Sequence, residues 1–390
     1  MIIVKENRTF DELFGRFPGA NGATTGSCFG RTIALRRAPQ IYPKDLPHSF
    51  GDGRVDFDGG KLDRFCRDDP RVTNYAYSQI YPGQAPNYWH WAHRFEIADD
   101  FFASHRGPSF PNHQYLIAAQ AGGATDGPGW TAQPPGPGLT RTWGCDAPHR
   151  ETVPILDTEG HRIRVPPCFD YTTEGDLLTQ AGLDWSYYSG TDSQSGYAWS
   201  AYSAVRHIRE SDQWMQHIKG VDGFLHDAET GALPAVTWVT PRFPVSEHPL
   251  PPTNACQGEN WTTLLVDALM RSPDWGSTAV FVTWDDWGGF YDHVPPRSVD
   301  RFGFGFRVPL LVISPYAKAG NIDHHEGEFS SILRFIEDNW SLGQLTARDR
   351  SATDMSYDFD FAQQPMPPDP LPLRQGCVGG EPIPEGIPTS

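Results

Sequence analysis

The chain has 390 residues, 38% of them hydrophobic, and carries 31 Lys and Arg against 48 Asp and Glu, for a net charge of −17. This size suits one large α/β domain or two smaller ones. The acidic balance argues against nucleic-acid binding, because a phosphate backbone requires a basic footprint; an anionic substrate would need a local positive charge, which a bound metal can supply.

Short apolar runs alternate with helical patterns along the chain. Residues 1–4 predict a strand, and 109–123 predict a helix with Ser109 near its N-cap and Gly122–Gly123 as its end. Further strands are predicted within 231–241, 278–284 and 307–315, and further helices within 258–273 and 328–340. Strands that alternate with helices indicate an α/β fold with a mostly parallel central sheet and helices on both faces.

No linker in the sequence requires a second domain. We therefore expect one domain over residues 1–363, with long Gly/Pro-rich loops or a small cap formed by about 124–230. The Gly/Pro-rich stretch 122–144 predicts a long surface loop. Residues 364–390 are Pro-rich and polar, which predicts a tail packed on the surface.

The six cysteines lie in loop-like contexts, and none forms a CxxC pair, which argues against a zinc ribbon or a thioredoxin-like site. Their even number favours disulfides and an oxidising compartment; the alternative is six free thiols in a cytosolic enzyme. The sequence shows neither a signal peptide nor the apolar run of about 18 residues that a membrane-spanning helix needs.

Polar groups follow several of the predicted strands. Glu6–Asn7 follows the first strand, Glu247–His248 comes soon after the strand within 231–241, and Asp285–Asp286 directly follows a buried strand. Ser109 opens its predicted helix after an acidic run. Because ligands bind beyond the carboxyl ends of strands in open α/β sheets, we expect these four groups to meet at one site.

The adjacent carboxylates Asp285 and Asp286 repel each other unless water screens them or a cation lies between them. Taken alone, Asp285–Asp286 would suit a solvated turn, and Glu6–Asn7 would suit a turn or a helix cap. Together, Glu6, Asn7, Asp285 and Asp286 offer the oxygen ligands that a hard or borderline divalent cation prefers. The combination favours a single cation site built from two distant parts of the chain.

Ser109 stands at a helix N-terminus, where backbone N–H groups and the helix dipole favour an anion such as phosphate. Its hydroxyl is a poor nucleophile unless a base or a metal lowers its pKa, and the alternative is a plain helix cap. Four histidines in polar contexts could protonate a leaving group or contact phosphoryl oxygens: His48, His113, His248 and His293.

These motifs resemble a known family. The segments that carry the resemblance are KENRTFDELFG (5–15), HSF…GGKLDRF (48–65), GPSFPNHQYL (107–116), SEHP (246–249), TWDDWGGFYDHV (283–294), RVPLLVISPYAKAG (307–320) and EFSSILRFIEDNW (328–340). The chain resembles the bacterial and plant phosphoesterase family that includes non-specific phospholipases C and acid phosphatases, within the alkaline phosphatase superfamily. The resemblance runs over nearly the whole chain and implies an alkaline-phosphatase-like sandwich.

The resemblance also implies roles for individual residues. It makes Ser109 the nucleophile and a metal ligand, His248 an active-site histidine, and His48 and His293 members of active-site segments. It implies one divalent ion, either Ca, Mg, Mn, Zn or Fe, held by Glu6, Asn7, Asp285 and Asp286. It further implies the pairs Cys145–Cys168 and Cys256–Cys377 and a secreted or periplasmic location. Cys28 and Cys66 are left over, and their pairing stays open.

The sequence thus predicts metal-dependent hydrolysis of phosphate esters through a phosphoseryl intermediate on Ser109, of either the phospholipase C or the acid phosphatase type. The aromatic-rich segments 87–95, 185–190 and 197–203 could contact a phospholipid head group, but aromatic residues are also ordinary core material. The alternatives are a phosphodiesterase or phosphomonoesterase of non-lipid substrates and a non-catalytic secreted binding protein. A sulfatase is disfavoured because its C/S-x-P-x-R motif is absent.

Overall fold

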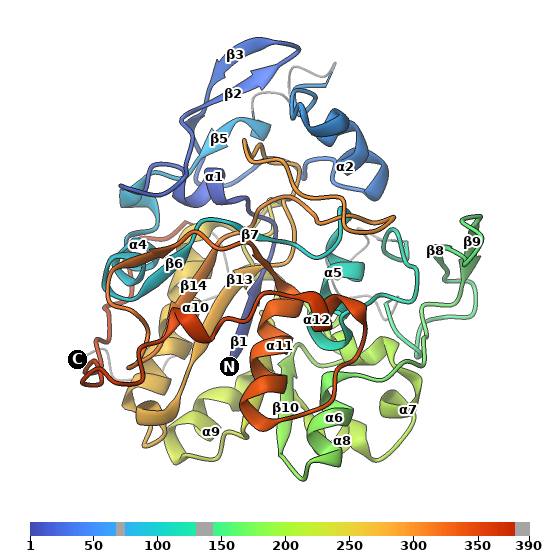
Figure 1. The fold of residues 1–390 in the computed structure, drawn as a ribbon, viewed down its shortest axis with the longest axis vertical. Coiled ribbons are helices and arrows are strands. Elements are labelled where there is room, and N and C mark those ends of the chain that lie inside the picture. Colours follow the sequence, from blue (N-terminus) through green and yellow to red (C-terminus); the bar gives the residue numbers. More distant parts are fainter. Residues whose placement is uncertain (68–74, 130–142, 379–390) are drawn as a thin grey trace.

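A computed structural model describes residues 1–67, 75–129 and 143–378, which surround one central eight-stranded sheet (Figure 1). The strands lie in the order β11 (Ile218–Gly220), β10 (Trp185–Ser189), β12 (Val236–Val239), β1 (Ile2–Lys5), β13 (Val280–Trp284), β14 (Leu310–Ile313), β6 (Glu96–Ala98) and β15 (Asn321–Asp323). Only β14 runs antiparallel to its neighbours among these strands. The prediction of a mostly parallel sheet is confirmed.

Helices cover both faces of the sheet. In β12, Trp238 donates from its indole to the carbonyl of Leu116 in α5 (Ser109–Ala118) at 3.1 Å. In β1, Lys5 donates instead to the carbonyl of Gly258 in α10 (Ala255–Arg271). Because Trp238 pairs with Ile2 and side chains alternate along a strand, Trp238 and Lys5 lie on opposite faces. Burial on both sides explains the continuous apolar runs of the central strands.

The other helices are shorter or flank this core. α4 (Pro86–Arg94) and α9 (Phe224–Thr230) contact α10, and α11 (Phe329–Trp340) contacts α5. The remaining helices are α1 (Phe10–Phe14), α2 (Phe50–Phe57), α6 (Glu174–Gln180), α7 (Arg206–Arg209), α8 (Gln213–His217) and α12 (Ala347–Ser351). Two-stranded pairs complete the structure: β2 (Thr25–Cys28) with β3 (Arg31–Ala34), β4 (Arg36–Arg37) with β5 (Ser78–Gln79), β7 (Phe101–Phe102) with β16 (Gly327–Glu328), and β8 (Val153–Leu156) with β9 (Arg162–Val165).

Residues 124–230, expected as a possible cap, instead contribute two strands to the main sheet. β10 and β11 form one edge of that sheet, while the β8–β9 hairpin stands outside it. Figure 1 shows α1, α2 and the β2–β3 hairpin at the end of the molecule toward which β1 runs. The lobe beyond the carboxyl ends of the strands is therefore built mainly from the N-terminal part of the chain. Most of the expected loop 122–144 lies outside the described residues.

Helix α5 differs in detail from its prediction. Its N-cap is Pro108, and Ser109 is its first residue, so the Ser109 hydroxyl does not cap the helix. The helix ends at Ala118, and Ala119 takes the left-handed conformation with φ of 51°, before the expected end at Gly122–Gly123. The first difference matters for function, because it leaves the Ser109 hydroxyl available for other partners.

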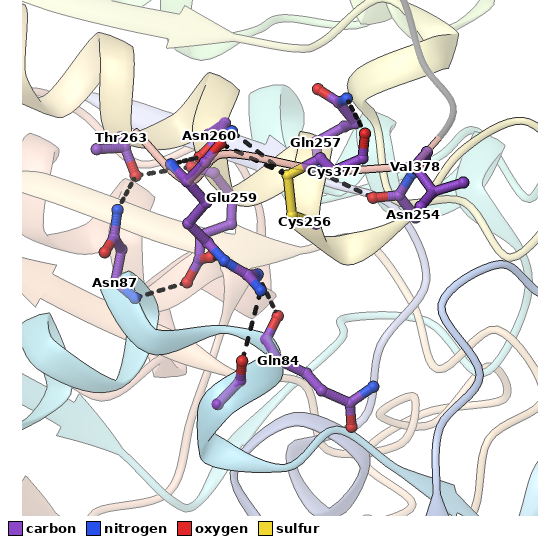
Figure 2. Close-up of a disulfide and its surroundings, with 12 residues drawn as sticks. Gln84, Asn87, Asn254, Cys256, Gln257, Glu259, Asn260, Thr263, Cys377 and Val378 are labelled. Atoms are coloured by element: carbon purple, nitrogen blue, oxygen red, sulfur yellow. Dashed lines mark hydrogen bonds and ion pairs between the residues drawn. A yellow bond between two sulfur atoms is a disulfide. The ribbon is translucent and has the colours of Figure 1, made fainter. Parts of the chain in front are cut away.

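The described part of the tail, up to residue 378, lies against α4 and α10 (Figure 2). Asn87 donates to the carbonyl of Pro372 at 3.1 Å, and Arg374 pairs with Glu259 at 3.0 Å. The disulfide Cys256–Cys377 joins the tail to the first turn of α10. Cys145–Cys168 also forms a disulfide, so both expected pairs are present, and Cys28, whose partner was left open, pairs with Cys66. Among the described helices, none has both the length and the apolar content needed to span a bilayer.

Candidate active site

The site begins where β1 and β13 end side by side. Lys5 pairs with Trp284 in the parallel ladder, so the next residues, Glu6 and Asp285, emerge together at the carboxyl edge of the sheet. The backbone N–H of Asn7 donates to Asp285 Oδ1 at 2.9 Å, and its side-chain amide donates to Asp286 Oδ1 at 2.8 Å. Two segments that are nearly 280 residues apart in the chain are thereby joined.

A tight turn after Asp286 makes this junction possible. The N–H of Gly288 donates to Asp286 Oδ1 at 2.6 Å, and Gly288 has φ of 57°. A Cβ atom at this position would lie 2.5 Å from the Cβ of Asn7. Only glycine combines this conformation with so close an approach, so the turn fixes the Asp286 carboxylate against the end of β1.

Ser109 faces this group of carboxylates from the N-terminus of α5. Its Oγ lies 3.1 Å from Glu6 Oε2 and 3.3 Å from Asp286 Oδ2. One turn further along the helix, His113 Nε2 lies 2.9 Å from Glu6 Oε1 and 3.7 Å from Asp285 Oδ2. The i, i+4 spacing places both side chains on the same helix face. Burial lowers the pKa of His113 to about 4, which favours a neutral ring.

The carboxylates are buried without a matching positive charge. Glu6, Asp285 and Asp286 are fully buried. Burial, followed by repulsion from the neighbouring carboxylates, raises the pKa values of Glu6 and Asp286 well above their usual range. The buried oxygens Asn7 Oδ1 and Asp285 Oδ2 accept no hydrogen bond. Unused oxygen lone pairs and an uncompensated negative charge are the features that a divalent cation satisfies, so this set of donors fits such an ion.

His48 and His248 lie close together, and Asp45 contacts both rings. Asp45 lies 3.6 Å from His48 Nδ1 and 3.9 Å from His248 Nε2, and the two rings are 6.0 Å apart. Burial alone would lower the pKa of His48, but Asp45 and Asp286 outweigh it and raise this pKa to about 9. Burial lowers the pKa of His248. The pair therefore combines one charged and one neutral imidazole near neutral pH.

His293 was expected to face the same site, but the structure places it in another cluster. Its Nδ1 lies 2.7 Å from Asp11 Oδ2, and its Nε2 lies 3.1 Å from Asn21 Oδ1. Among the contacts of the described residues, none joins it to Glu6, Asp285 or Asp286. The "DH" pair in TWDDWGGFYDHV is close to the acidic pair in sequence, but the glycine turn between them directs the chain away.

Sequence reasoning missed two acidic residues beside the site. Asp45 lies in an irregular segment, and the only signal for it was its place three residues before His48. Glu247 was noted as part of a polar cluster, but no role was assigned to it. Its carboxylate accepts hydrogen bonds from Tyr88 and Trp284 and lies 3.5 Å from the ammonium of Lys5. These partners come from three separate segments, which no local pattern reveals.

With this geometry established, comparison with known proteins identifies the family. The family model described as "Phosphoesterase family" matches residues 1–343, a range that contains every site residue named above. The chain belongs to the phosphoesterase family. Phosphoesterase membership confirms the resemblance first seen in the sequence motifs.

Several curated relatives are phospholipases C. The chain is 26% identical over 467 residues to phospholipase C B of Mycobacterium tuberculosis, covering 97% of this chain and 82% of the relative. It is 24% identical to the hemolytic phospholipase C of Pseudomonas aeruginosa, covering 93% of this chain and 55% of the relative. It is 23% identical to non-specific phospholipase C6 of Arabidopsis thaliana, covering 90% and 69%. This phosphoesterase thus spans little more than half of the Pseudomonas relative.

Solved structures resemble the chain only distantly. The structure of Ps i-CgsB is 12% identical, with a TM-score of 0.41, and covers 81% of this chain and 74% of its own. A Vibrio parahaemolyticus protein described as belonging to the alkaline phosphatase superfamily is also 12% identical, with a TM-score of 0.39, and covers 84% of this chain and 74% of its own.

Proposed function

We propose that this phosphoesterase hydrolyses phosphate esters with Ser109 as the nucleophile and one divalent metal ion as its cofactor. The observation that carries the proposal is the position of the Ser109 hydroxyl. It lies at a helix N-terminus and 3.1 Å and 3.3 Å from oxygens of Glu6 and Asp286, within a buried set of oxygen donors. Helix N-termini bind phosphate, and carboxylates that share a cation also hold the attacking oxygen near it.

Glu6, Asn7, Asp285 and Asp286, with the Ser109 hydroxyl, would hold the metal ion. When bound, the ion supplies positive charge that lowers the pKa of the serine hydroxyl and offsets the negative charge of the phosphoryl group. Asn7 contributes by orienting both aspartates through its backbone and side-chain donors. His113 holds Glu6 in place through its 2.9 Å contact.

The proposed reaction has two steps. Ser109 Oγ loses its proton to a neighbouring carboxylate and attacks phosphorus in line, forming the phosphoseryl bond as the bond to the leaving alcohol breaks. His48 supports this step, because its raised pKa keeps it protonated at neutral pH and able to donate a proton to the leaving oxygen. Water then attacks the phosphoseryl phosphorus, releasing the phosphate product and restoring the serine hydroxyl.

We further propose a phospholipid head group as the substrate, of the phospholipase C type. The support is the set of relatives named as phospholipases C in two bacterial genera and a plant. The competing substrate is a phosphate monoester, as in an acid phosphatase, or a non-lipid diester. A purely binding role is disfavoured, because the nucleophile and the oxygen donors are all present in one place.

The decisive experiment compares wild type with Ser109→Ala on a phosphatidylcholine vesicle, p-nitrophenyl phosphorylcholine and p-nitrophenyl phosphate. We expect hydrolysis of the choline esters by wild type and a loss of about a thousandfold or more in the variant, as for an essential nucleophile. Activity of Ser109→Ala near that of wild type would refute the nucleophile assignment. Faster turnover of the monoester than of both choline esters would assign the acid phosphatase type. Elemental analysis of the same preparation identifies the ion.

We also propose that the protein works outside the reducing cytosol, in a secreted or periplasmic location. All six cysteines form disulfides, and disulfides persist in oxidising compartments. Cell fractionation of the native host with an antibody against the protein tests this location.

A further inference from the structure

Glu247 is a fully buried carboxylate next to the site, in contact with Lys5 and Trp284, and the proposed reaction does not use it. It precedes His248, and its backbone has φ of 76°, in the left-handed region that non-glycine residues rarely adopt. Tyr88 donates to Glu247 Oε1 at 2.6 Å, and the Trp284 indole donates to Oε2 at 3.2 Å. Lys5 Nζ lies 3.5 Å from Oε1. Both carboxylate oxygens are therefore held.

Two of the partners of Glu247, Lys5 and Trp284, directly precede residues of the site. Lys5 is the last residue of β1 and immediately precedes Glu6. Trp284 is the last residue of β13 and immediately precedes Asp285. The carbonyl of Ser246 also accepts the backbone N–H of Glu6 at 3.0 Å. A single carboxylate thus connects the segments that present Glu6, Asp285 and His248.

Helix α10 packs against the side chains of Glu247 and Lys5 through Gly258. A Cβ atom at Gly258 would lie 2.1 Å from Glu247 Cγ and 2.4 Å from its Oε1, so glycine is required for the carboxylate to fit. Lys5 Nζ also donates to the carbonyl of Val245 at 2.7 Å and to that of Gly258 at 3.1 Å. Every side-chain polar atom of the pair has a partner, and both side chains are fully buried.

Stability alone does not account for such a pair. Moving two charges out of water is costly, and well-packed apolar residues of similar volume often give an equal or higher free energy of unfolding. The left-handed backbone of Glu247 lowers the free energy of unfolding further. A strained backbone next to an active-site histidine is characteristic of functional positioning.

We propose that Glu247, paired with Lys5, is a positioning residue that fixes His248 relative to Glu6 and Asp285. The carboxylate holds the turn at residues 246–248 against the ends of β1 and β13. The distance between the imidazole of His248 and the carboxylates of Glu6 and Asp285 is thereby fixed. This inference rests on the proposed function, since it concerns the same site. It assigns Glu247 no contact with substrate or metal.

The test uses Glu247→Gln, which keeps the shape of the side chain and removes its charge, and the double variant Lys5→Met/Glu247→Gln, which removes both charges. The matched control is Glu259→Gln. Glu259 is equally buried and paired with Arg374 at 3.0 Å; it accepts the backbone N–H of Tyr88, but no hydrogen bond or ion pair of the described residues joins it to residues 5–7, 246–248 or 284–286. For each protein, kcat and KM on p-nitrophenyl phosphorylcholine, the urea midpoint and Mn²⁺ affinity by titration calorimetry are measured.

We expect Glu247→Gln and the double variant to lose about 100-fold in kcat, the cost of a misplacement near 1 Å. KM and Mn²⁺ affinity should change by less than about threefold, since substrate and cation donors remain. Glu259→Gln should keep kcat within about twofold even where its urea midpoint falls. If the double variant folds and retains kcat within about twofold, or if Glu259→Gln loses as much kcat as Glu247→Gln, the proposal is wrong.

A readout without turnover separates this proposal from the proposed function. Nitrogen-15 NMR of the imidazole of His248 in the isotopically labelled protein reports its surroundings directly. The proposal requires that signal to shift or broaden in Glu247→Gln and to stay unchanged in Glu259→Gln; an unchanged His248 signal in Glu247→Gln overturns it. If wild type hydrolyses no phosphoester while the His248 signal responds as expected, only the proposed function fails.

Discussion

Two acidic clusters in this protein are built from the same two segments of chain, residues 6–12 and 285–293, yet they are balanced in different ways. The first contains Glu6, Asp285 and Asp286, and the second contains Asp11 and Asp292. All five carboxylates are fully buried. Comparing the two clusters shows which partners balance the charge of a buried carboxylate in the folded protein.

The second cluster is neutralised within the chain. Arg307 is fully buried, and its guanidinium contacts Asp292 Oδ1 at 3.1 Å and Asp11 Oδ1 at 3.2 Å. It also donates to the carbonyls of Asn21 and Asp99 at 2.7 Å and 2.5 Å. His293 adds a contact to Asp11 from the solvent side. All the charges of this cluster have partners in the chain.

The first cluster has no such arginine. His113 contacts Glu6, but its lowered pKa leaves it neutral. His48, whose pKa Asp45 and Asp286 raise to about 9 against the effect of burial, is a single charged imidazole near three buried carboxylates. The comparison indicates that the chain balances the carboxylates of the second cluster internally and leaves those of the first cluster largely unbalanced, where we propose that a cation binds. Four predictions test this distinction, in order of decreasing effect.

The largest effect is expected for Asp286→Asn in the first cluster. Loss of one carboxylate should lower kcat/KM by about a thousandfold or more and lower the metal content, because the cation loses a charged ligand. The urea midpoint of the metal-free protein should stay the same or rise, since like-charge repulsion is relieved. Activity assays, elemental analysis and urea unfolding measure the three quantities. A large loss of metal-free stability would contradict this view of the cluster.

In the second cluster, Arg307→Met should lower the free energy of unfolding by about 3–5 kcal/mol, because it leaves two buried carboxylates uncompensated. The metal content per folded molecule should stay as in wild type. The control is Arg297→Met, whose ion pair with Glu326 is largely exposed and should contribute no more than about 1 kcal/mol. Loss of the metal from folded Arg307→Met would show that the two clusters are not independent.

His248 and His293 should differ in their contribution to catalysis. We expect His248→Ala to lower kcat by about 100-fold, within the range of general acid–base catalysis, and His293→Ala to change kcat by less than about threefold. Steady-state assays on folded protein measure both effects. Equal losses in the two variants would place His293 in the active site after all.

The smallest effect concerns pH. Burial alone would lower the pKa of His293, but its hydrogen bond and attraction to Asp11 outweigh burial and raise this pKa above 6.5. The stabilisation is therefore complete below the unfolded pKa of 6.5 and is lost as pH rises through the folded value. His293→Asn should destabilise by about 0.5–1 kcal/mol at pH 5.5 and by less at pH 9.5. Urea unfolding at both pH values measures the difference, and a loss that grows with pH would exclude this pair as its source.

Much of this arrangement could be predicted from local sequence. The apolar runs of β1 and β13 identified buried parallel strands, and parallel strands bring the residues after them to one edge. That reasoning placed Glu6, Asn7, Asp285 and Asp286 together, and the helix pattern after residue 108 brought Ser109 to the same edge. The resemblance to a known family supplied two of the three disulfide pairs, Cys145–Cys168 and Cys256–Cys377, and the assignment of the nucleophile.

The rest depended on contacts that no local pattern contains. His293 and His248 occur in similar polar contexts, and only the positions of Arg307 and Asp11 in three dimensions separate them. The role of Glu247 depends on Lys5 and Trp284, whose side chains contact its carboxylate from two distant parts of the chain. The end of α5 was misplaced because Ala119 adopts the left-handed conformation that is usually expected of glycine.

The central position of β1 also constrains how the protein is made. Its two neighbours, β12 and β13, are encoded more than 230 residues later, so β1 has no partner in the sheet until β12 has emerged from the ribosome and lacks its second neighbour until residue 284 has emerged. Contacts of such long sequence separation form slowly, because the intervening chain must first be closed into a loop. Nascent chains that stop before β13 hold an apolar strand without one or both of its partners, and these are the species that a folding helper would need to shield.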